Sequence, residues 1–356
     1  MAEEGQREDR AEAGGGSTLT VLLALASNVG VGVLKLVAGL LTGSAAMLAE
    51  AAHSVADTAT EVLLLTALRR SARPADRFHP FGYGKERFFW ALIAAVSVFV
   101  TGATFSVYEG VSTIVAGEGE QTLAWVAYGV LAVSAVIEGT SWSRSVRQIR
   151  AESRELGISP VRYLRLSDDP TVKSVFFEDS AALVGLALAA LGVGLHQLTG
   201  SGMVDGIASL LIGVLLAGVA FVLGRTNRTL LIGRTAGPAL VHDAFDLLAD
   251  APEVDAVVDI QTMVTGTDSV LLCARVDFVD ALTAADLERA CVRLDDELRD
   301  ALPDLDEIFI EPVPRNDPDV RAAVLERYGD VLAQWQAQRD RRVGRAARAQ
   351  GSRASR

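Results

Sequence analysis

The sequence has few of the residues that stabilise small secreted domains or zinc-ribbon folds. Its 356 residues include only two cysteines, Cys273 and Cys291, and four histidines, which excludes a disulfide framework and a Cys-rich zinc fold. It has no basic stripe outside the extreme C-terminus and its formal net charge is −12, so it lacks the surface that neutralises nucleic-acid phosphates. Charged residues are also scarce over long stretches before residue 224 and frequent after it. These absences indicate one half inside a membrane and one half in water.

Six long apolar runs lie before residue 224. A helix needs about 20 apolar residues to cross roughly 30 Å of hydrocarbon. Runs of that kind occupy residues 19–41, 44–68, 88–115, 122–143, 172–195 and 203–223. The first follows an acidic tail without a basic segment, which argues against a signal peptide. We therefore predict a disordered tail at 1–18 and a six-helix transmembrane domain at 19–234.

Lysine and arginine collect in alternate connections between these runs. They occur in 69–87, 144–173 and 225–234, whereas 42–44, 116–121 and 196–202 contain none. Because short cytoplasmic loops accumulate Lys and Arg, both termini are expected in the cytoplasm. We expect a multi-pass protein of the cell (inner) membrane.

The segment 235–315 has the pattern of a cytoplasmic α+β domain of the ferredoxin-like sort. We predict a helix at 238–248, a hairpin of strands 254–264 and 269–279 turning at 266–268, a helix at 283–302 and a strand at 308–313. Thr283 is the expected N-cap of the second helix. The segment holds 19 Asp and Glu against 5 Arg and no Lys, which favours solubility or attracts cations. A helix through Trp335 and a disordered basic tail that contacts anionic lipid are expected at 316–356.

The second apolar run carries ionisable residues, which are costly at membrane depth and therefore mark function. Glu50, His53, Asp57 and Glu61 recur at spacings of three and four, so a helix places them on one face. An imidazole and a carboxylate one turn apart suit Zn²⁺ and neighbouring transition metals better than Ca²⁺ or Mg²⁺. The alternative is a His–Asp hydrogen bond that only packs this helix on a neighbour.

Other runs supply further polar residues. Glu178 and Asp179 are the only acids of the fifth run, and adjacent helical residues diverge by about 100°, so both cannot face a site equally. Acids that only favour the start of a helix are the alternative. Asn28 and Lys35 share a face of the first run, where Lys35 needs an acidic partner such as the stripe acids. Asp205 begins the sixth run, and capping explains it as well as ion handling does.

Three segments together resemble the cation diffusion facilitator family, in its zinc-exporting form. They are GS followed by LAEAAHSVAD within 43–57, HPFGYGKE at 79–86, and Asp205 followed by ASLLIG at 208–213. The resemblance extends over nearly the whole chain. Within the family, the Glu-Asp pair of the fifth run resembles the branch of the mitochondrial member of the human zinc transporters.

The resemblance implies a transport site made of one pair of ligands from the second helix and one from the fifth, each pair four residues apart. His53 and Asp57 match the first pair and Asp179 matches half of the second, but Val175 stands at the remaining position. The candidates for the missing ligand are Glu178, a water molecule, Asn28 and Asp205.

Two other metal sites of the family are incomplete in this sequence. Some members hold a metal between the second and third helices with an Asp and two His; Asp76 and His79 match, but Tyr83 replaces the second His. The metal pair that others bind in the C-terminal domain needs several histidines, and 235–315 contains only His242. We therefore expect at most a secondary site at Asp76 and His79.

The sequence thus predicts a homodimeric secondary transporter that exports a divalent metal from the cytoplasm in exchange for protons. Zn²⁺ is the first candidate, with Mn²⁺, Fe²⁺, Co²⁺ and Ni²⁺ open. His53, Asp57 and Asp179 must release protons to bind metal, so they would couple the two flows. The metal is cargo and no resident cofactor is expected. A membrane metalloprotease would need a His-Glu-x-x-His stretch, which is missing. The alternative function is a non-transporting regulator or scaffold acting through the acidic domain.

Overall fold

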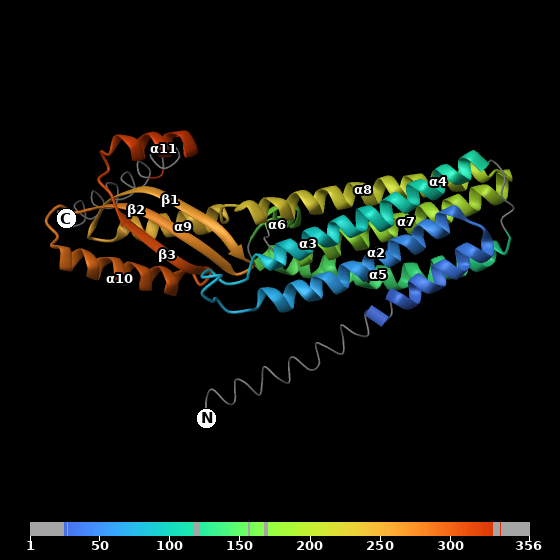
Figure 1. Ribbon diagram of the computed structural model, residues 1–356, viewed down its shortest axis with the longest axis horizontal. Coiled ribbons are helices and arrows are strands. Elements are labelled where there is room, and N and C mark those ends of the chain that lie inside the picture. The colour runs from blue at the N-terminus through green and yellow to red at the C-terminus, as the bar shows by residue number, and fades with distance from the viewer. Residues whose placement is uncertain are drawn as a thin grey trace, which may run out of the picture. The chain divides into compact units, whose positions relative to one another are not determined.

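The computed structural model describes residues 25–26, 28–116, 122–155, 157–166, 170–329 and 335. Contacts divide the chain into two compact units, Met1–Ile232 and Gly233–Arg356. The first is a bundle of long helices and the second combines a sheet with helices (Figure 1). This confirms the expected fold class, a helical membrane-type domain followed by an α+β domain. The tail expected at 1–18 and the basic tail beyond Trp335 lie outside the described residues.

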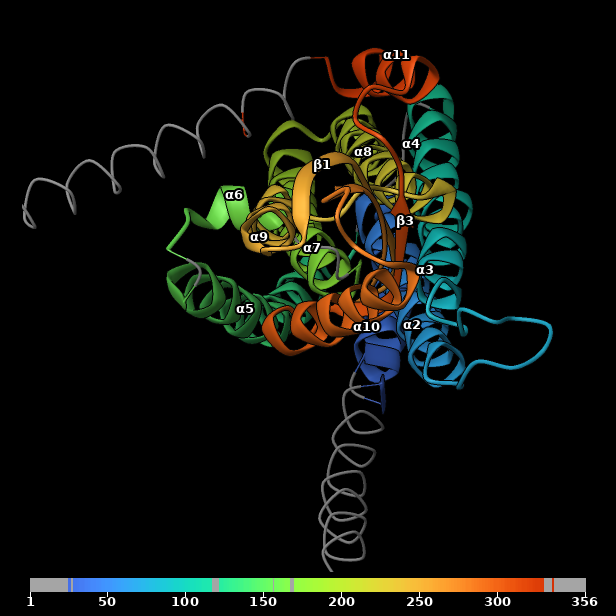
Figure 2. The same cartoon turned by 90° about the vertical axis from the view of Figure 1, so that its left-hand side faces the viewer.

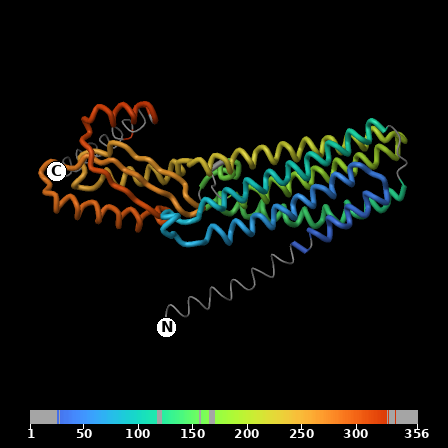
Figure 3. Tube along the Cα trace, viewed as in Figure 1, coloured from blue at the N-terminus to red at the C-terminus, as the bar shows by residue number. Residues whose placement is uncertain are grey.

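The helices of the first unit run alongside one another, as the Cα trace in Figure 3 shows. The first is described over Asn28–Thr42. It is followed by α2 (Ala45–Ser71), α3 (Glu86–Ser97), the π-helical segment η1 (Val98–Ala103), α4 (Thr104–Ala116), α5 (Ala124–Glu155), α6 (Pro160–Leu166), α7 (Pro170–Thr199) and α8 (Gly202–Ile232). Both α5 and α8 extend well past the predicted ends. The hydropathy pattern marks only the apolar part of a helix, and its backbone hydrogen bonding continues into the polar part.

Four of the described helices are long and apolar enough to cross a membrane. They are Glu86–Ala116, which joins α3, η1 and α4, and the helices α5, α7 and α8. At 27 residues α2 has the necessary length, but its acidic stripe reduces its hydropathy. The described part of the first helix is apolar and shorter. Of the six predicted spans, the structure therefore supports the last four by length and hydropathy. The second is too polar to meet the hydropathy criterion, and the described part of the first is too short.

Small residues let the helices of the bundle approach closely. α8 packs against α3, α4 and α7, while α2 packs against α3, α7 and α8; the end view in Figure 2 shows α4 beside α8. A Cβ atom on Gly110 would lie 2.7 Å from the carbonyl oxygen of Gly206, and one on Gly206 would lie 2.8 Å from that of Gly110. In a membrane the hydrophobic effect does not drive helices together, because lipid is as apolar as a leucine side chain. Close packing at glycine residues stabilises the helix contacts instead.

The second unit is built on a three-stranded sheet. Its elements are α9 (Pro238–Asp250), β1 (Val254–Gly266), β2 (Ser269–Phe278), α10 (Ala284–Ala301), β3 (Leu305–Pro312) and α11 (Pro318–Tyr328). The strand order is β1-β2-β3, with β1 and β2 antiparallel and β2 and β3 parallel. Thr283 caps α10 in a reciprocal capping box with Asp286, as its sequence predicts. The ring of Trp335 packs against Phe245 of α9, with 5.5 Å between centroids.

A candidate metal site between α2 and α7

The polar stripe of α2 brings His53 and Asp57 together. The Nδ1 atom of His53 lies 3.4 Å from Oδ1 of Asp57, and the His53 side chain is only 1% exposed. Neither ring nitrogen of His53 has a hydrogen-bond partner among the described residues, nor has Oδ1 of Asp57. A packing hydrogen bond between the two is therefore not formed. Buried polar atoms are nearly always satisfied, so this unpartnered pair is suited to receive a ligand.

The two acids of α7 have different surroundings. Glu178 is buried, its Oε1 has no hydrogen-bond partner among the described residues, and it lies close enough to Asp57 for the two carboxylates to repel each other. Asp179 instead accepts a hydrogen bond from the Ser141 hydroxyl of α5, at 2.8 Å. The divergence of adjacent helical residues therefore directs Glu178 toward α2 and Asp179 toward α5.

The ligands are not gathered into one complete shell. Within the described ranges, no group of three His, Cys, Asp or Glu side chains is close enough to hold a metal ion. His53 and Asp57 are in contact and Glu178 is near Asp57, whereas Asp179 is held by Ser141. In the described structure the predicted ligands lie near one another, between α2 and α7. Their oxygen and nitrogen atoms do not converge on one position where a metal ion could bind.

The first helix contributes two polar contacts to the same region. The Asn28 amide donates to Oε1 of Glu61 at 2.5 Å. The Lys35 ammonium lies 3.0 Å from Oε2 of Glu50 and 3.7 Å from Oε1 of Glu138 on α5. The stripe acid Glu50 is thus the partner of Lys35 that the sequence predicts. Sequence reasoning missed Glu138, although an acid inside an apolar run is the same signal that identified Glu50.

Asp205 lies at the start of α8 but caps a different helix. Its Oδ1 accepts a hydrogen bond from the Ser44 hydroxyl at 2.8 Å, and its Oδ2 accepts from the backbone amides of Ala45 and Ala46 at 2.5 and 3.4 Å. Both carboxylate oxygens are therefore engaged by the N-terminus of α2. Asp205 thereby holds the N-terminus of the helix that carries His53.

Asp76 and His79 lie in the connection between α2 and α3. Oδ1 of Asp76 accepts from the amides of Phe78 and His79 at 2.8 Å each, and Oδ2 accepts from the Tyr83 hydroxyl at 2.8 Å. These bonds lower the pKa of Asp76, chiefly through Tyr83, and the hydrogen bond to Asp76 raises the pKa of Tyr83. Nδ1 of His79 is 3.5 Å from Asp76, and both side chains are about half exposed. This arrangement orders the loop, and no third metal-binding side chain joins it among the described residues.

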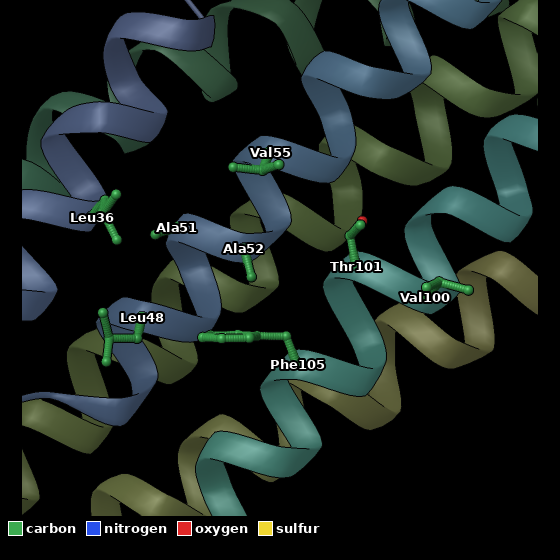
Figure 4. A pocket seen from close by; sticks show the side chains of 8 residues that line it. All are labelled: Leu36, Leu48, Ala51, Ala52, Val55, Val100, Thr101 and Phe105. Carbon is green, nitrogen blue, oxygen red and sulfur yellow. The ribbon is translucent and has the colours of Figure 1, made fainter.

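An apolar hollow of 380 Å³ lies on another side of α2, between the first helix and the segment formed by η1 and α4. Leu36, Leu48, Val55 and Phe105 line it, and Phe105 points from α4 toward α2 (Figure 4). Among the described residues that line it, Thr101 alone has a polar side chain. Without imidazole or carboxylate groups, this hollow is not suited to a metal ion.

A bundle of long apolar helices that buries an imidazole and carboxylates is typical of membrane proteins that bind cations. The chain matches the family described as the cation efflux transmembrane domain over residues 21–232, and it belongs to that family. This confirms the family predicted from the sequence.

Several relatives show how far the similarity extends. The chain is 39% identical over 244 residues to "Proton-coupled zinc antiporter SLC30A9, mitochondrial" of Xenopus laevis, covering 68% of the chain and 44% of the relative. Identity to the Homo sapiens protein of the same name is 36%, over 68% of the chain and 43% of the relative. "Metal tolerance protein C4" of Arabidopsis thaliana is 30% identical over 82% of the chain and 62% of the relative. The chain thus spans less than half the length of these animal relatives.

The expected location in a cell (inner) membrane is contradicted by these relatives. The proteins from Xenopus laevis and Homo sapiens are named as mitochondrial. The distribution of Lys and Arg indicates which connections share one side of a membrane, but it does not identify the membrane. The prediction failed because it used a rule of orientation to infer a location.

Proposed function

We propose that this protein is a secondary transporter that moves zinc across a membrane in exchange for protons. The observation that carries the proposal is His53, a buried imidazole without a hydrogen-bond partner among the described residues, 3.4 Å from the Asp57 carboxylate inside a membrane-type bundle. Membership in the cation efflux family and the names of the animal relatives support zinc as cargo and the proton as counter-ion. In this proposal the protein is a transporter rather than an enzyme.

His53 and Asp57 of α2 bind the ion together with Glu178 and Asp179 of α7. Glu178 takes the place of the ligand lost at Val175, because its Oε1 is buried, unpartnered among the described residues and on the side of Asp57. Asp179 joins when its carboxylate leaves the Ser141 hydroxyl. The described arrangement is then an open form of the site, and binding draws α7 toward α2.

Exchange follows from competition for the same atoms. Imidazole and carboxylate bind a metal only in their deprotonated forms, so a dication and protons displace one another. Carboxylates that lie close together share protons as a group, and their joint protonation follows the difference in pH across the membrane. Alternating access requires only that helices rock around a site near the middle of the membrane. His53, Asp57 and Asp179 carry the protons in the return step.

The proposal includes a homodimer in which the acidic second unit contributes to association. Size-exclusion chromatography with light scattering on the purified chain tests this part separately. A monomer would remove the dimer from the proposal without changing the transport site.

The decisive test is zinc uptake into proteoliposomes that contain a zinc-sensitive dye, under an imposed pH gradient. Wild-type protein should accumulate zinc and release protons, and a protonophore should abolish the accumulation. Asp57→Ala and His53→Ala should lose uptake, while Asp76→Asn serves as a control that removes a carboxylate from a loop. Asp57→Ala uptake equal to that of wild type would refute the site. A wild-type protein without proton counterflow would favour the regulator or scaffold.

A further inference from the structure

Lys35 is a fully buried cation that joins three helices. Lys35 itself is a residue of the first helix. Its ammonium lies 3.0 Å from Oε2 of Glu50 on α2 and 3.7 Å from Oε1 of Glu138 on α5. The side chains of Lys35 and Glu50 are both 0% exposed, and that of Glu138 is 13% exposed. Two carboxylates from different helices therefore share one ammonium that is itself shielded from solvent.

The bundle is shaped around the Glu50 carboxylate. Its Oε1 atom is buried without a hydrogen-bond partner among the described residues. A Cβ atom at Gly185 of α7 would overlap this oxygen, so the absence of a side chain there leaves the room that Glu50 occupies. The ion pair is thus accommodated from three sides, by the first helix, by α5 and by the backbone of α7.

Stability alone does not explain such a pair. Removing two charges from water costs several kcal/mol per ion, and apolar residues of similar volume often replace buried ion pairs without loss of stability. The position of the pair supplies another reason. Glu50 precedes His53 by one helical turn, and Lys35 lies close enough to His53 and Asp57 to act on their charges.

We infer that Lys35 is a positioning residue that balances the charge of Glu50 next to the transport site, an inference that rests on the proposed function. With the pair intact, Glu50 neither competes for the metal nor adds negative charge, and the ammonium does not repel an incoming dication. The charge that attracts the ion is then left to Asp57 and the acids of α7. The Glu138 carboxylate of α5 also faces the ammonium, 3.7 Å away.

The inference predicts effects of opposite sign for the two halves of the pair. Zinc affinity of the purified full-length chain in detergent would be measured at one fixed pH. Glu50→Gln removes one negative charge while the ammonium stays, and it should weaken zinc binding at least about tenfold, because a more positive surrounding repels a dication. Lys35→Met should bind zinc as tightly as wild type or more tightly. The double variant K35M/E50Q, which removes both charges, should return to the wild-type affinity.

Glu109→Gln is a matched control, because it removes one carboxylate from α4 and should leave zinc affinity unchanged. Thermal unfolding in the same detergent monitors folding of each variant. If K35M fails to fold, the comparison between E50Q and K35M/E50Q still decides, since neither variant keeps the fully buried Glu50 carboxylate without its ammonium partner.

The inference is overturned if Glu50→Gln binds zinc like wild type, or if both single variants weaken binding and the double variant does not recover. Either result would reduce the pair to a packing contact. Wild-type protein that binds no zinc would instead remove the proposed function, and this inference with it.

Discussion

Asp205 of α8 accepts a hydrogen bond from the backbone amide of Ala45, 2.5 Å away, at the first residue of α2. Asp205 is 1% exposed, so the backbone amides at the N-terminus of α2 donate the hydrogen bonds that water would otherwise donate to its carboxylate. A negative charge is favoured there by the unpaired amides and the dipole of the helix. One helix is thereby capped by another, and the contact fixes the position of α2 along the bundle.

Replacing Asp205 by alanine should destabilise the bundle by about 1–3 kcal/mol, because buried amides lose their acceptor. Asp205→Asn keeps one acceptor oxygen without the charge, so its loss should be smaller. Thermal unfolding in detergent measures both. Equal melting temperatures for wild type and Asp205→Ala would show that the contact does not hold α2.

The sequence is sufficient to predict features that depend on spacing along one element. The stripe of His53 and Asp57 follows from the helical period, and the cap at Thr283 follows from local hydrogen bonding with Asp286. The link between Asp205 and Ala45 joins residues 160 positions apart, so it exists only through the packing of α8 on α2. Glu138 could have been noticed as an acid inside the fourth apolar run, but its pairing with Lys35 depends on the packing of α5 against the first helix.

The two acids of α7 should respond differently to substitution. Glu178→Gln should weaken zinc binding strongly, because Glu178 faces Asp57 with an unpartnered oxygen. Ser141→Ala removes the hydroxyl that Asp179 must leave to reach the ion, so zinc affinity should be as high as in wild type or higher. Isothermal titration with zinc measures both variants. A normal affinity for Glu178→Gln beside a large loss for Asp179→Asn would make Glu178 structural.

Gly185→Ala should destabilise the bundle by about 1–3 kcal/mol, since the added methyl group overlaps the buried Glu50 carboxylate and forces it to move. Gly218→Ala on α8 is a matched control, because no atom lies within 4 Å of a Cβ atom built there. Thermal unfolding in detergent compares the two variants. If Gly185→Ala is as stable as Gly218→Ala, α7 or the Glu50 side chain can shift to accommodate the methyl group at little cost in free energy.

The loop between α2 and α3 offers a test at alkaline pH. The Tyr83 hydroxyl donates to Asp76 at 2.8 Å, and this hydrogen bond is the main cause of the raised pKa of Tyr83. A group whose pKa is raised in the folded state stabilises that state below its ordinary pKa, and the contribution is lost as the pH rises through the raised value. The Asp76 carboxyl, whose pKa is lowered, contributes above its ordinary pKa and loses this contribution as the pH falls through the lowered value. The loop should therefore be most ordered between these two limits.

Asp76→Asn should lower the pH at which Tyr83 ionises, because the amide no longer places a negative charge beside the phenol. Ultraviolet absorbance during an alkaline titration follows tyrosinate formation, and Tyr83→Phe identifies the step that belongs to Tyr83. If wild type and Asp76→Asn show this step at the same pH, the two side chains do not interact in solution. Zinc uptake should be the same in both, since Asp76 orders a loop and binds no ion in transit.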